Sequence, residues 1–152
     1  MKLAEALIER KAIKNKMEEL KKRIYQNSQV QEGDEPVEEP LALMKLLYKE
    51  SDEFEKLVIR INTTNIKTEL SNGLNMMEAL IKRDMLRYKY FIYNNLADKA
   101  TPSTDRYSQR EIKFVSTIDI TDIRKKADEI AKESRLLDMK IQEENWSTDL
   151  LS

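Results

Sequence analysis

Apolar positions recur every three or four residues over most of the chain, with charged residues between them. This spacing places apolar side chains on one side of an α-helix, so it predicts amphipathic helices. In residues 2–27 the steps alternate between 3 and 4, which is typical of a packed helical seam. The positions on this seam are Leu3, Ala6, Arg10, Ile13, Met17, Leu20 and Ile24.

Three more helices are expected, at residues 39–66, 76–99 and 122–145. Asn75 followed three residues later by Glu78 approximates a capping box, so the second of these should begin directly after Asn75. Its apolar stripe is expected at Met77, Leu80, Ile81, Met85, Tyr88, Ile92 and Leu96.

A polar connection at residues 28–40 separates the first two helices and contains Gly33, Pro36, Pro40 and five acids. It is the strongest break in the helical pattern, so we expect an acidic loop there, which is a candidate for mobility. Because 152 residues correspond to one domain, we expect residues 1–152 to form a single helical domain.

Two stretches lack the helical period. Residues 68–74 contain an Asn-Gly dipeptide, which favours a tight turn and predicts a small hairpin. In residues 101–121, Ile112 and Phe114 alternate with charged residues, which predicts one or two short strands. The expected fold class is mainly α: four long amphipathic helices in a coiled-coil-like bundle, with a small β excursion of one or two short strands.

The chain has no histidine and no cysteine, and charged residues make up 36% of it. This removes the side chain that ordinarily titrates near neutral pH, thiolate nucleophiles, disulfides and soft metal ligands. The net charge of −1 predicts no general attraction to nucleic acid or anionic membranes. We find no signal peptide and no run of about 18 apolar residues, so we expect a soluble, cytoplasmic protein without integral membrane association.

Two arrangements of charged residues are candidate sites. Paired acids one helical turn apart, such as Glu50 and Glu53, can hold Mg²⁺ or Mn²⁺, but lysines lie close by and most such pairs belong to solvated faces. We therefore expect no metal and no cofactor. Arg10 and Asp84 both interrupt apolar stripes, and because a charge there is costly unless paired, we expect them to form a buried or half-buried ion pair between the first and third helices.

Polar groups are concentrated in residues 105–113, where the candidates for binding a partner or ligand are Arg106, Tyr107, Arg110 and Lys113. No nucleophile, base and orienting group can be assigned there, so we identify no catalytic residue. We expect the segment to be docked through the apolar residues that follow it rather than to remain a loose linker.

Aromatic residues lie on several faces of the latter half of the third helix. One groove within a single chain cannot cover rings that point in several directions. We therefore expect a homo-oligomer with part of its interface at Tyr88, Tyr90, Phe91 and Tyr93.

The chain also resembles the septicolysin-like family of small bacterial proteins. The resemblance implies a helical, coiled-coil-like fold, brings no catalytic residues, and its name implies a pore-forming cytolysin. It is carried by MKLAEALIER at 1–10, QEGDEP at 31–36, RINTTN at 60–65, EALIKRD at 78–84, DRYSQREIKFVSTIDI at 105–120 and IQEENWSTDL at 141–150.

The leading hypothesis for function is a non-enzymatic, self-associating helical protein that acts as a cytoplasmic scaffold or partner-binding module. A pore-forming cytolysin is the alternative that the resemblance implies. A metal-dependent, all-α hydrolase of a phosphorylated small molecule is the second alternative.

Overall fold

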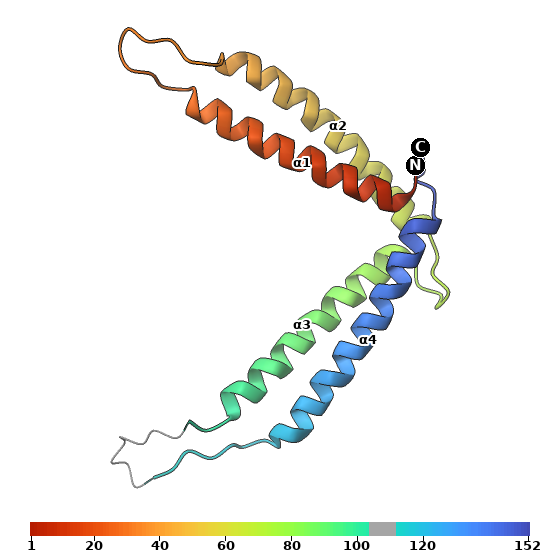
Figure 1. The fold of residues 1–152 in the computed structure, drawn as a ribbon. Coiled ribbons are helices and arrows are strands. Elements are labelled where there is room, and N and C mark those ends of the chain that lie inside the picture. The colour runs from red at the N-terminus through yellow and green to blue at the C-terminus, as the bar shows by residue number, and fades with distance from the viewer. Residues whose placement is uncertain (104–111) are drawn as a thin grey trace. The chain divides into compact units, whose positions relative to one another are not determined.

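The computed structural model describes residues 1–103 and 112–152. It contains four helices in these ranges, α1 (Leu3–Gln26), α2 (Pro40–Lys67), α3 (Met76–Ala100) and α4 (Ile120–Ser147) (Figure 1). Each boundary lies within two residues of its expected position. The mainly helical class and the four helices predicted from the spacing of apolar residues are thus confirmed.

The chain divides into two compact units. Unit 1 consists of Met1–Glu69 and Gln142–Ser152, and unit 2 of Leu70–Ile141. Unit 1 therefore contains α1 and α2, whereas unit 2 contains α3 and most of α4. That the whole chain behaves as one domain remains a prediction.

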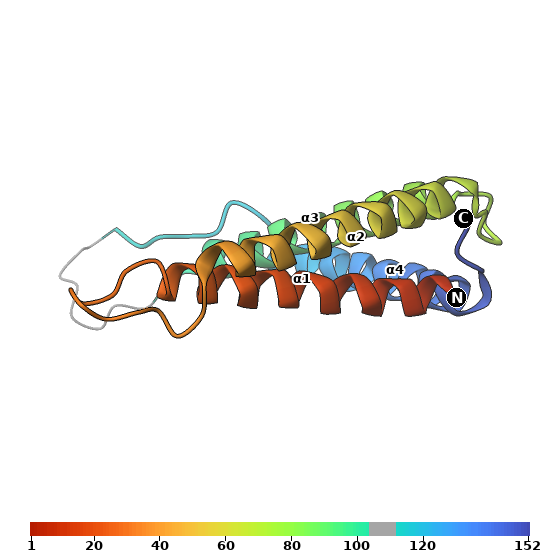
Figure 2. The ribbon, with the colours of Figure 1, turned by 90° about the horizontal axis from the view of Figure 1, so that it is seen from above.

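Within unit 1, α1 and α2 lie side by side as an antiparallel hairpin (Figures 1 and 2). Leu20 and Ile24 of α1 are buried with Leu43 of α2, and Met44 and Leu47 pack against them. These residues lie on the apolar stripes of the two helices, so burial of those stripes holds the hairpin together.

The N- and C-terminal residues of unit 1 bond to each other, and we call this contact the terminal clasp. The Leu3 amide donates to the Thr148 carbonyl at 2.9 Å, and the Leu150 amide donates to the Met1 carbonyl at 2.9 Å. The Lys2 ammonium also lies 2.9 Å from the Asp149 carboxylate. The clasp thus satisfies backbone donors at both ends of the described chain.

The tail beyond the clasp is fixed to α2. Thr64, which is fully buried, donates its hydroxyl to the Arg60 carbonyl at 2.8 Å and accepts from the Leu151 amide at 3.0 Å. Arg60 Nε in turn donates to the Leu151 carbonyl at 2.9 Å. The polar residues near the end of α2 therefore have a structural use, because they provide hydrogen-bond partners for an incoming chain segment.

Within unit 2, α3 and α4 form a second antiparallel hairpin (Figure 1). The predicted capping box is confirmed, since the Asn75 side chain accepts from the Glu78 amide at 2.8 Å and the Asn75 amide donates to Glu78 Oε2 at 2.9 Å. At the start of α4, Asp119 accepts from the Asp122 amide at 3.1 Å. Both helices thus begin with a side-chain acceptor for a free backbone N–H.

The prediction of a small β excursion, with one or two short strands, is wrong for the residues that the structure describes. These residues contain isolated β-bridges but no strand. Residues 68–74 form only a tight turn, closed by a 2.8 Å bond from the Leu70 amide to the Leu74 carbonyl, with Gly73 at a φ of 82°. A strand needs a neighbouring strand for its backbone groups, and neither stretch finds one within the described chain.

That the segment after residue 105 is docked remains a prediction. Residues 104–111 lie outside the described residues. Beyond them, Ile112 is 86% exposed and Phe114 is 77% exposed, so these two side chains bury little apolar area, whereas Ile118 and Ile120 are half-buried. Alternation of apolar and charged residues does not by itself create a surface for them to cover.

Candidate interaction surface

The third helix has two apolar sides, and one of them is buried. Met76, Ala79 and Ala97 are fully buried, and Leu86 is 7% exposed. These positions follow helical spacing, so they lie on one side of α3. Three of the four lie at or near the ends of the helix, and two are alanines, which permit close approach of another helix.

The other side of α3 is exposed although its side chains are large and apolar. Six residues step by 4, 4, 3, 4 and 4 along the helix and are 40–59% exposed. At 3.6 residues per turn they cover an arc of about 100°. We call this surface the α3 apolar face, and it consists of Met77, Ile81, Met85, Tyr88, Ile92 and Leu96.

The α3 apolar face differs from what the sequence alone suggested. Its six residues belong to the predicted stripe, whose seventh member, Leu80, is half-buried, and no property of the sequence distinguished this stripe from a buried seam. Of the four aromatic residues, Tyr88 belongs to the face and Phe91, 63% exposed, lies at its edge. Helical spacing places Tyr90 and Tyr93 on the other side of α3, and Tyr93 is half-buried. That these four residues lie at an oligomer interface remains a prediction.

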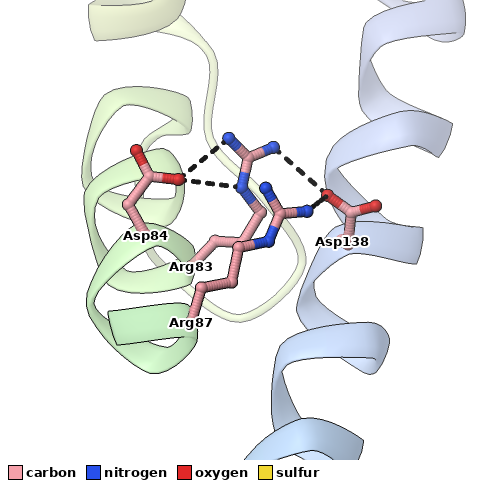
Figure 3. A network of polar contacts seen from close by, with 4 residues as sticks. All are labelled: Arg83, Asp84, Arg87 and Asp138. Atoms are coloured by element: carbon pink, nitrogen blue, oxygen red, sulfur yellow. Dashed lines mark hydrogen bonds and ion pairs between the residues drawn. The ribbon is translucent and has the colours of Figure 1, made fainter. Parts of the chain in front are cut away.

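Ion pairs fix the rotation of α3 against α4 (Figure 3). Arg83 Nη1 lies 3.2 Å from Asp138 Oδ1 on α4, and Arg87 Nη2 lies 3.4 Å from the same oxygen. Arg83 Nη2 is also 3.1 Å from Asp84 Oδ1. With the Arg83 side chain only 18% exposed, this side of α3 is held toward α4, which leaves the α3 apolar face on a different side.

Two further pairs join the same helices along their length. Lys82 Nζ lies 3.8 Å from Glu133 Oε1, and Arg124 Nη2 lies 2.8 Å from Asp98 Oδ1. All four of these side chains are about half exposed, so each pair contributes little to stability. The two pairs fit the same antiparallel register of α3 and α4 as the Arg83 and Arg87 contacts, so they help to define how the two helices are aligned.

The structure does not place Asp84 as expected. Its side chain is 58% exposed and pairs with Arg83, its neighbour in the sequence. The prediction that Asp84 is buried or half-buried is therefore wrong. An aspartate at the edge of an apolar stripe can turn its short side chain into solvent, which removes the cost that motivated the prediction. Arg10 is half-buried on α1, in the other unit. Its pairing with Asp84 remains a prediction.

Of the four candidates for binding a partner or ligand, three lie outside the described residues: Arg106, Tyr107 and Arg110. Lys113 is described and is exposed. Their joint role therefore remains a prediction.

Unit 1 contains a shallow groove of about 360 Å³ between α1 and α2. Glu50, 8% exposed, lines it and accepts a hydrogen bond from Lys16. Arg23 lines it as well and binds Glu38, with Nε 2.9 Å from Oε2, and this hydrogen bond lowers the pKa of Glu38. Because these charges are compensated by protein side chains, the groove resembles an ion-paired helix seam more than a ligand site. Within residues 1–103 and 112–152, no three or more acidic side chains are grouped so as to hold a metal ion.

These features define a small all-α protein built from helical hairpins, with one long apolar face left exposed. The chain belongs to a family of unknown function (DUF6847), which matches residues 10–150. It is also similar to a functionally unknown conserved protein from Corynebacterium diphtheriae, known from a crystal structure. The two chains are 45% identical, the match covers 99% of each, and the TM-score is 0.93. A comparison with curated proteins gave no match.

The resemblance to septicolysin-like proteins is therefore wrong, since neither the family nor the solved structure has any link to them. The stretches that suggested it are short and mostly helical, and short segments rich in leucine, glutamate and lysine recur in unrelated helices. A cytolytic function rested on that resemblance alone. None of the helices in the described part of the chain is long and apolar enough to cross a membrane.

Proposed function

We propose that this protein is a non-enzymatic helical protein that associates with itself through the α3 apolar face, and that it acts as a cytoplasmic scaffold or partner-binding module. The observation that supports this is the exposure of six large apolar side chains along the length of one helix. Scattered exposed apolar residues are normal, whereas a contiguous face of this kind marks an interaction site.

The size of the face is appropriate for a protein contact. Taking about 200 Å² for a fully exposed large side chain, six side chains at about half exposure present roughly 600 Å². This is at the upper end of the largest apolar patch on a typical monomer, about 300–600 Å². The composition also fits, because methionine and aromatic side chains are enriched at interfaces.

Light scattering coupled to size-exclusion chromatography tests the proposal. We expect a mass above the 17.9 kDa of one chain for the purified protein at about 100 µM, well above the Kd of a modest, micromolar interface. Ile81→Glu should convert the protein to monomer, because association would bury its carboxylate. The matched control is Ile59→Glu on α2, since Ile59 is 57% exposed and Ile81 is 56% exposed.

Circular dichroism should show equal helix content in both variants, so that loss of association is not loss of folding. A monomeric wild-type protein at this concentration would refute self-association. If Ile81→Glu and Ile59→Glu leave the mass equally unchanged, the α3 apolar face is not the contact surface.

A further inference from the structure

The spacing of the α3 apolar face indicates which partner covers it. We infer that a second copy of this chain packs there with its α3 antiparallel to the first, an inference that rests on the proposed self-association. The argument depends on the order of the six residues along the helix and on their exposure.

The steps of 4, 4, 3, 4 and 4 read the same in both directions, so the face is symmetric about a point between Met85 and Tyr88. A two-fold axis through that point reverses the second helix and brings each residue opposite another member of the same set. Two-fold dimers use the same surface on both subunits, which this symmetry permits along the whole length of the face.

Each pair produced by that axis joins two apolar side chains of suitable size. Ile81 faces the partner's Ile92, which matches two β-branched residues. Met85 faces the partner's Tyr88, and a thioether against an aromatic ring is a favourable contact. Met77 faces the partner's Leu96 at each end of the interface. No pair in this register buries a charge.

The spacing also indicates how the two helices would run. Each residue of the first half of the face recurs eleven residues later, so 77, 81 and 85 correspond to 88, 92 and 96. An 11-residue period equals 3.67 residues per turn and favours a nearly straight or right-handed pair rather than the left-handed supercoil of heptad repeats. A parallel pair would instead place the two Met77 side chains together and the two Leu96 side chains together.

Together the two copies of the face would contribute roughly 1,200 Å² of buried surface, at the low end of the about 1,200–2,000 Å² of specific interfaces. The dimer is therefore expected to exchange subunits readily, which makes mixing experiments possible.

The experiment uses disulfide trapping in the full chain, which has no cysteine of its own. Met77→Cys and Leu96→Cys are purified separately, one with a mass tag, mixed in equal amounts and oxidised. In the antiparallel dimer the two positions from different subunits meet, whereas two copies of position 77 lie about 28 Å apart along the helix. A disulfide requires Cα atoms about 4.4–6.8 Å apart.

We expect covalent dimers in the mixture and none from either variant alone. Random exchange of subunits makes half of the dimers mixed, so up to about half of the protein can be trapped. Efficient trapping of each variant with itself would overturn the antiparallel arrangement in favour of a parallel one. Ile81→Cys mixed with Ile92→Cys is the second pair, used if the first variants do not dimerise in reducing buffer.

A variant with Ile59→Cys, on the exposed side of α2, controls for random collision. If the proteins dimerise by light scattering but no α3 pair is trapped above this control, the inference fails and self-association stands. If wild-type protein is monomeric, the proposed function fails as well.

Discussion

Replacing Asp138 with asparagine tests how α3 is held on α4. Asp138 Oδ1 accepts from Arg83 at 3.2 Å and from Arg87 at 3.4 Å, and its side chain is 33% exposed. The substitution keeps the shape but leaves two guanidinium groups without their shared carboxylate. Exposed pairs contribute about 0.2–1 kcal/mol, and breaking a buried pair costs about 3–5 kcal/mol. For this intermediate burial we expect a loss of about 1–2 kcal/mol in the free energy of unfolding.

Asp84→Asn is the matched control, because Asp84 accepts from the same Arg83 at 3.1 Å but is 58% exposed and is adjacent in sequence. Loss of the Asp84 carboxylate charge should change the free energy of unfolding by no more than about 0.5 kcal/mol. Urea titrations followed by circular dichroism measure both variants, and the Asp138→Asn effect should shrink in about 1 M salt, where charges are screened. Equal losses for the two variants would refute the view that Asp138 anchors α3 to α4.

Two other predictions concern the turn before α3 and the terminal clasp. Gly73→Ala should lower the free energy of unfolding by about 1 kcal/mol, because Gly73 has a φ of 82°, where a side chain is disfavoured. Gly73→Asn should lower it by less, and urea titrations in which the asparagine variant is the less stable of the two would contradict this. The hydrogen bond from Lys2 lowers the pKa of Asp149 below its ordinary value of 3.8, so the ion pair stabilises the clasp above that pH and is lost as the pH falls through the lowered pKa. The acid titration of the Asp149 carboxylate, followed by NMR, should therefore have its midpoint at a lower pH in the wild type than in Lys2→Met, where the pKa returns toward its ordinary value; equal midpoints in the two proteins would contradict this.

Local rules predicted the helices well because their signals are local. Each helix repeats its apolar spacing over many turns, so an error at one position does not change the assignment. The start of α3 depends on two side chains and two backbone groups within four residues, Asn75 to Glu78, and this capping box formed as predicted. At the start of α4, Asp119 likewise accepts from a backbone amide only three residues away, that of Asp122.

The sequence was less informative wherever the structure of a segment depends on another part of the molecule that packs against it. Ile112 and Phe114 have the composition of a strand, but a strand also requires a free edge, which no local pattern reveals. The two sides of α3 present a similar difficulty. Its exposed side carries larger apolar side chains than its buried side, which includes Ala79 and Ala97. The size of the apolar residues therefore does not indicate which side of α3 packs within the chain.

The terminal clasp has a consequence for the order in which the molecule is assembled. Unit 1 joins Met1–Glu69 to Gln142–Ser152, and all residues between them belong to unit 2. On the ribosome, at roughly 5–20 residues per second, the α1–α2 hairpin emerges several seconds before the residues that bond to Met1 and Leu3. Both hairpins can therefore form from local contacts while the Leu3 amide is still bonded to water. The clasp is then a late, long-range closure, and its entropic cost is small because the chain it closes is already folded.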